Sequence, residues 1–258
     1  MLRLALSIYI VSEPSKIMAA LDCRPRPQIT ARVEFHGRDH EAAIVVDDFL
    51  LDARPLVEFA STEGKFAPVE ANLYPGIRAP LPNAYMRMLV SCLQEPIAGI
   101  FGLTDIDLRR AEGDFSIVTT PPDRLSVLQC LPHFDTTDPG QVAVLHYLCR
   151  PEQGGTSFYR QRSTGFERID AARQEEFMAA LNRDIHAGGP PARNYMQGDS
   201  AMFERIGKLE AAFNRLVIYR SATLHSGDIP PGFAFDPDPR TGRLTANAFL
   251  HFRRNTGA

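Results

Sequence analysis

Several features that mark common protein classes are missing from this chain of 258 residues. There is no tryptophan, and none of the four cysteines forms the C-x-x-C pair of a zinc ribbon or a thioredoxin-type site. Scattered cysteines in a chain of this length are most simply free thiols, so we expect a cytoplasmic location. No segment reaches the roughly 18–20 apolar residues of a membrane-spanning helix, so we expect no membrane association.

The N-terminus also lacks a convincing targeting segment. One arginine precedes a short apolar stretch that ends at Glu13 and Pro14, and no A-x-A cleavage site follows directly. We therefore expect no secretory signal peptide, with Met18 as an alternative start to Met1.

Neither sign of charge is in large excess. Lysine and arginine number 28 against 31 acidic residues, which gives a net charge of −3. This balance argues against a sequence-independent nucleic-acid binder, and we expect no nucleic-acid partner. With 44% hydrophobic and 23% charged residues, the composition is that of an ordinary globular protein and excludes a disordered chain, a collagen-like repeat or a coiled coil.

Short strand-like runs dominate the second half of the chain, separated by turn sequences rich in Pro, Gly and Asp. We predict strands at 41–50, 115–120, 125–131, 141–149, 156–161, 216–225 and 244–252, and helices at 52–64, 81–103 and 170–185. No strand–helix–strand alternation with a Gly-rich turn is present, which excludes a Rossmann or P-loop protein.

This order of elements predicts a mainly β, α+β protein. We expect a double-stranded β-helix, the cupin-like jelly roll, braced on one face by the N-terminal helices. Residues 1–40 would form a tail or edge segment, and residues 41–258 a single domain.

A candidate metal site begins at His133-Phe134-Asp135. Residues i and i+2 of an extended chain point to the same face, so this imidazole and this carboxylate can share a metal ion. His225, which ends an apolar strand, is the best candidate for a third ligand. Two histidines and one carboxylate form the facial triad that leaves three positions of Fe(II) open. An isolated H-x-D is nevertheless common and usually marks a polar strand end.

Five segments in order resemble the non-haem Fe(II)/2-oxoglutarate oxygenase superfamily, and most of all its prolyl-4-hydroxylase-like branch. The resemblance covers roughly residues 43–60 and 114–253. The segments are AIVVDDFLLDARPLVEF (43–59), PHFD (132–135), VLHYLCRPEQGGTSFY (144–159), NRLVIYRSATLHSG (214–227) and GRLTANAFLHF (242–252).

The resemblance implies that His133, Asp135 and His225 bind Fe(II). It also implies that Arg243 pairs with the distal carboxylate of 2-oxoglutarate, because a guanidinium meets a carboxylate with two parallel hydrogen bonds. Thr245, two residues further on the same strand, would add another contact.

Further positions follow from the same resemblance. Tyr147 occupies the place where related hydroxylases have a tyrosine on that carboxylate, and an alternative is a core aromatic residue. The spacing from His225 to Arg243 is 243 − 225 = 18 residues, longer than is usual in the family, so Arg220 is a competing anchor.

Asn247 and Phe249 share the strand face of Arg243, and with Arg220 they are candidate residues of the substrate pocket. Related halogenases have a small residue at the position of Asp135, so the carboxylate favours hydroxylation or another two-electron oxidation. The expected partners are O2 and a small-molecule or peptide substrate. Two alternatives stay open, a cupin-type metalloenzyme that does not use 2-oxoglutarate and a non-catalytic jelly-roll binding module. The sequence says nothing of oligomeric state.

Overall fold

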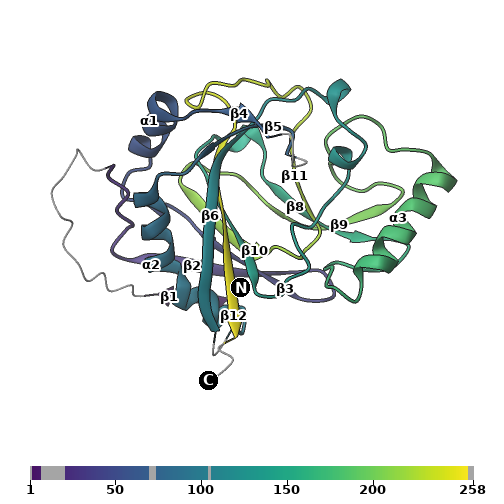
Figure 1. Cartoon of the computed structure of the whole chain (residues 1–258), viewed down its shortest axis with the longest axis horizontal. Coiled ribbons are helices and arrows are strands. Elements are labelled where there is room, and N and C mark those ends of the chain that lie inside the picture. Colours follow the sequence, from purple (N-terminus) through teal and green to yellow (C-terminus); the bar gives the residue numbers. More distant parts are fainter. Residues whose placement is uncertain (1, 7–20, 70–73, 104–105, 255–258) are drawn as a thin grey trace.

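A computed structural model describes residues 2–6, 21–69, 74–103 and 106–254 of the chain (Figure 1). Most of this part is antiparallel β-structure with few helices, as the sequence predicts, and the arrangement is consistent with a jelly roll. The strands are β1 Leu2–Leu6, β2 Ile29–His36, β3 Glu41–Val46, β4 Ala67–Pro68, β5 Gly76–Pro80, β6 Ile106–Val118, β7 Gln141–Tyr147, β8 Thr156–Gln161, β9 Phe203–Leu209, β10 Arg215–Arg220, β11 His225–Gly227 and β12 Leu244–Arg254.

Two sheets contain these strands. Within the described residues the larger sheet has the order β1-β2-β3-β10-β7-β12-β6-β5-β4, and the smaller one has the order β11-β8-β9. Both β10 and β12 pair antiparallel with β7, with Ile218 and Ala248 each opposite Val144. Strands far apart in the sequence are therefore neighbours, as a double-sheet fold requires.

The alternation of side chains sorts the apolar residues of the large sheet onto two faces. On one face, Val144 and Ile218 belong to a core cluster that also includes Leu56 and Leu89 of the helices. On the other face, the next residues along each strand form a second cluster with buried side chains of the small sheet. A cavity opens on this second face, between the two sheets.

The helices are α1 Arg54–Glu63, α2 Asn83–Ile100 and α3 Gln174–Gly188. Figure 1 shows α1 and α2 together at one side of the molecule and α3 at the opposite side. Short 3-10 turns occupy Pro122–Arg124, Leu128–Cys130 and Pro151–Gln153. None of the helices in the described part of the chain is long and apolar enough to cross a bilayer. All four cysteines are buried and free.

Some local predictions were wrong. Residues 125–131 do not form a strand, because their backbone closes into turns in which Gln129 N–H donates to Ser126 C=O at 3.1 Å. Val127 and Leu128 remain exposed, so the apolar run did not indicate burial. Strand β9 was not predicted at all, and β2 continues the large sheet into the segment before residue 41 through its hairpin with β3.

Candidate functional site

Three side chains of the predicted metal site converge although they lie up to 92 residues apart (225 − 133 = 92). One ligand atom from each of His133, Asp135 and His225 lies within 4.8 Å of the others. His133 Nε2 is 3.7 Å from Asp135 Oδ1, and His225 Nε2 is 3.9 Å from Asp135 Oδ2. Two imidazoles and one carboxylate at these distances are a suitable donor set for a divalent transition metal.

Backbone hydrogen bonds hold these three residues in place. His133 and His225 form an antiparallel bridge in which each N–H donates to the other residue's carbonyl, at 2.9 and 2.8 Å. The N–H of Asp135 donates to the carbonyl of Ser221 at 2.8 Å. The H-x-D segment is thus fixed directly beside the end of β10 and the start of β11.

The ring of His225 is oriented by a carbonyl. Its Nδ1 lies 2.9 Å from the carbonyl oxygen of Thr223, which can only accept, so Nδ1 carries the proton. The lone pair is then on Nε2, the atom that faces Asp135. An outer hydrogen bond of this kind is what usually fixes a metal-binding histidine.

The pKa values of the other two residues are shifted by their surroundings. Desolvation by the surrounding protein, then His225 and Arg78, lower the pKa of His133 well below its usual value. The His133 imidazole is therefore neutral at pH 7 and able to donate a lone pair. Burial raises the pKa of Asp135, and electrostatic interactions with His225 and Arg78 oppose this shift.

A cavity of about 560 Å³ contains the three side chains. Its lining includes Arg243, Thr245, Asn247 and Phe249 from β12, as their common face predicts. Thr156 of β8 and Tyr219 of β10 complete the wall between the sheets, and the Tyr219 ring packs against His225 with centroids 4.9 Å apart.

Arg243 is a buried cation in this wall, only 4% exposed. Its Nε donates to Gly154 C=O at 3.0 Å and its Nη2 to Gly155 C=O at 2.9 Å. Among the described residues no carboxylate lies within 4.0 Å of its guanidinium nitrogens. Burying a charge without a counter-charge is costly, so an anion in the cavity would be stabilised here.

Thr245 and Asn247 continue the polar wall from Arg243. Thr245 Oγ1 donates to Ser116 C=O at 3.4 Å, and Asn247 Nδ2 donates to Ser116 Oγ at 3.2 Å. The carbonyl oxygen of the Asn247 side chain is buried without a hydrogen bond. It is therefore an acceptor available to a ligand.

Two of the predicted residues lie outside the cavity lining. Tyr147 is fully buried, its hydroxyl is 2.7 Å from Thr156 Oγ1, and its ring lies 5.8 Å from the Arg243 guanidinium carbon. Arg220 follows Tyr219 on β10 and points to the opposite face, where it donates to carbonyls of Phe101 and Pro139. The placement of Arg220 in the pocket is thus corrected by the alternation of β10.

Sequence reasoning missed several lining residues, namely Arg78, Thr156, Tyr195 and Tyr219. Tyr219 carried a usable signal, because the same alternation that removes Arg220 places its neighbour in the cavity. The sequence around Arg78 carried no such signal, because β5 is a short GIRAP segment without apolar alternation.

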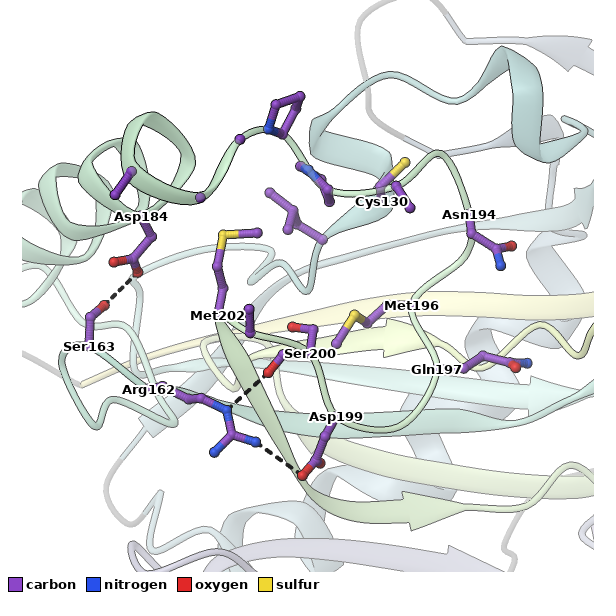
Figure 2. A pocket seen from close by; sticks show the side chains of 18 of the residues that line it. Cys130, Arg162, Ser163, Asp184, Asn194, Met196, Gln197, Asp199, Ser200 and Met202 are labelled. Atoms are coloured by element: carbon purple, nitrogen blue, oxygen red, sulfur yellow. Dashed lines mark hydrogen bonds and ion pairs between the residues drawn. The ribbon is translucent and has the colours of Figure 1, made fainter.

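A second hollow of about 630 Å³ lies beside this cavity and shares Leu131 and Tyr195 with it. The loop after α3 forms much of its wall (Figure 2). Its one arginine already has partners, since Arg162 donates to Asp199 and to the carbonyl of Ser200, each at 3.0 Å. No charged group in this wall therefore awaits a ligand as Arg243 does.

Comparisons with known proteins give one family and several distant structures. DUF6445, described as a family of unknown function, matches residues 27–250. HygX from Streptomyces hygroscopicus, solved with nickel, 2-oxoglutarate and hygromycin B, is similar over 84% of this chain and 85% of that chain, at 12% identity and a TM-score of 0.46. SnoN, a non-heme alpha ketoglutarate dependent epimerase from nogalamycin biosynthesis, is similar over 84% and 79%, at 11% identity and a TM-score of 0.45. No curated protein matches the chain.

Proposed function

The chain belongs to DUF6445, a family of unknown function, and we propose that it is an Fe(II)- and 2-oxoglutarate-dependent dioxygenase that hydroxylates a small molecule or a peptide side chain. One observation carries the proposal: the cluster of His133, Asp135 and His225 shares a cavity with a buried arginine that has no carboxylate partner among the described residues. A 2-oxoglutarate molecule has a carboxylate at each end, so it can reach a metal and pair with a guanidinium at once.

In this proposal His133, Asp135 and His225 hold the iron through two neutral imidazoles and one carboxylate. When bound there, the iron would activate O2 as the oxidant, and both 2-oxoglutarate and a C–H bond of the substrate would be oxidised. The Thr223 carbonyl keeps Nε2 of His225 directed to the metal.

Arg243 pairs with the distal carboxylate of 2-oxoglutarate. The carbonyls of Gly154 and Gly155 bind its Nε and Nη2, which fixes the plane of the guanidinium and leaves Nη1 for the ligand. Thr245 stands on the same side of β12 and supplies a hydroxyl. The ring of Tyr147 lies beside the Arg243 guanidinium, with its centre 5.8 Å from the guanidinium carbon.

Apolar side chains cover part of the cavity wall, while His133 stays open to solvent with 49% of its side chain exposed. Tyr219, Phe249 and Leu131 line the cavity around the polar groups. A substrate that fills this space would displace water from the cavity, which would strengthen the ion pair with Arg243.

Anaerobic thermal unfolding with Mn(II) and 2-oxoglutarate, added singly and together, tests this proposal. Each ligand at about 1,000 times its Kd stabilises the folded protein by about 4 kcal/mol. We expect stabilisation by Mn(II), a further rise with 2-oxoglutarate only when Mn(II) is present, and loss of both in His133→Ala. Arg243→Met keeps the response to Mn(II) and loses that to 2-oxoglutarate, whereas Arg253→Met on the same strand keeps both.

The alternatives give different patterns. A cupin-type metalloenzyme responds to the metal alone, and Arg243→Met leaves its behaviour unchanged. A binding module without a metal site responds to neither ligand. Iron- and 2-oxoglutarate-dependent formation of succinate in air, absent from Arg243→Met, completes the test.

A further inference from the structure

A second arginine, Arg78 of β5, lines the cavity without a hydrogen bond from its side chain to any described residue. Its Nε is buried and unpaired. Its Nη1 forms a long ion pair with the half-exposed Asp114, at 3.9 Å from Oδ2 and so beyond hydrogen-bond range, and its guanidinium carbon lies 4.5 Å from the centre of the Tyr74 ring. Stacking on an aromatic face holds a guanidinium in place while leaving its edge free.

Two other arginines with restricted access to solvent, Arg160 and Arg220, are satisfied within the protein. Arg160 pairs with Glu167 and Glu204, and Arg220 donates to two carbonyls. A buried donor without a partner is costly, so its occurrence in a cavity wall points to a ligand that completes it.

The position of Arg78 places that ligand near the proposed metal. Arg78 lines the same cavity as His133, Asp135 and His225, so a ligand in that cavity can meet both its guanidinium and the metal site. The cosubstrate already has its own cation in Arg243, so the cavity holds one guanidinium beyond the need of 2-oxoglutarate.

We propose that Arg78 binds the carboxylate of the substrate that is oxidised, so that this substrate is a monocarboxylic acid with an apolar body. The inference rests on the proposed function. Glu112 also lines the cavity, and its negative charge disfavours a dianion such as a phosphate ester more than it disfavours a monoanion. The apolar side chains of Leu128, Leu131 and Phe134 line the same space and fit an aliphatic or aromatic body.

Calorimetric titration with a matched pair of probes tests this inference. Hexanoate and its uncharged analogue hexanamide are titrated into the protein loaded anaerobically with Mn(II) and 2-oxoglutarate. Because a hydrogen bond to a charged group is one of the stronger ones, we expect hexanoate to bind at least tenfold more tightly than hexanamide. Arg78→Gln abolishes this preference and Arg78→Lys retains part of it.

Arg109→Gln is the control, because Arg109 is an exposed arginine (side chain 54% exposed) on the neighbouring strand β6 and lies outside the cavity lining. The Arg109→Gln variant is expected to keep the preference for hexanoate over hexanamide. The inference is overturned if Arg78→Gln binds hexanoate as the wild type does, if the wild type shows no preference, or if hexyl phosphate binds more tightly than hexanoate.

The binding of 2-oxoglutarate by the same variants separates this inference from the proposed function. We expect Arg78→Gln to bind 2-oxoglutarate within about threefold of wild type. If it loses 2-oxoglutarate, Arg78 serves the cosubstrate and the inference fails while the proposed function stands. If the wild type binds neither Mn(II) nor 2-oxoglutarate, the proposed function fails, and the same titration of the metal-free protein still decides whether Arg78 binds a carboxylate.

Discussion

Replacing Glu167 by glutamine is expected to destabilise the protein by about 3 kcal/mol, because this carboxylate is the centre of a buried polar cluster. Its side chain is only 1% exposed. It accepts hydrogen bonds from the backbone N–H groups of Arg38 and Asp39, both at 3.0 Å, and forms an ion pair with Arg160. Glu167 thus ties the β2–β3 hairpin turn to β8.

The expected loss of stability follows from the hydrogen bonds and the ion pair that a glutamine amide cannot form. Glutamine has one acceptor oxygen where the carboxylate has two, so one of the two backbone N–H groups meets an NH2 group instead. Arg160 also loses its buried counter-charge and keeps only Glu204. For a chain of this size, a loss of 3 kcal/mol lowers Tm by roughly 6–12 °C.

Urea unfolding followed by circular dichroism measures the change. Glu204→Gln is the matched control, since Glu204 also pairs with Arg160 but is 40% exposed, and it is expected to cost at most about 1 kcal/mol. Equal effects of the two substitutions would refute the reasoning.

A pH series provides a second check on Glu167. Burial alone would raise its pKa, but the hydrogen bonds from Asp39 and Arg38 and the charge of Arg160 hold the pKa below 4.5. The ionised group therefore contributes its stability above about pH 4.5 and loses it as the pH falls through the lower, folded-state value. The difference between wild type and Glu167→Gln is expected to shrink over that acid range, and a difference independent of pH would contradict the assignment.

Three further predictions concern the scaffold around the site. Asn214→Gly keeps the left-handed backbone (φ +64°) but removes three side-chain hydrogen bonds, two to the backbone of Leu50 and one to His146, so unfolding in urea is expected to show a loss of about 2–3 kcal/mol. Burial lowers the pKa of His146 to about 4, so this ring stays neutral while the unfolded chain takes up a proton. Its contribution to stability is lost as the pH falls from about 6.5 to 4, and a histidine NMR titration that shows protonation near pH 6.5 would contradict this. Gly154→Ala places a Cβ 2.0 Å from the carbonyl oxygen of Asp228 at φ +86°, and we expect a calorimetric Tm reduced by a loss of at least about 2 kcal/mol, whereas an unchanged Tm would show that the loop relaxes freely.

The sequence predicted those parts of the fold that depend on local pattern. The alternation in residues 141–149 and 216–225 predicted strands that became β7 and β10, and the i, i+2 rule placed His133 and Asp135 side by side. The run at 125–131 was ambiguous, because a short apolar stretch without flanking β-structure satisfies a turn equally well.

Long-range contacts explain what the sequence did not predict. Arg78 reaches the cavity only because β5 pairs with β6, and no local pattern records that pairing. Arg220 looked suitable as an anchor by its distance from His225 along the chain, but the face of a strand residue depends on register. Its neighbour Tyr219, and not Arg220, lines the cavity.

The reciprocal hydrogen bonds between His133 and His225 determine how a metal ion would couple to folding. Because backbone hydrogen bonds join these two residues, we expect metal binding to order little additional chain and to lose little conformational entropy. This differs from a zinc finger, in which the metal-free chain is unfolded and part of the metal-binding free energy drives folding. A chelator would therefore leave this protein folded, and the intrinsic affinity of the three side chains would appear almost undiminished in the measured binding constant.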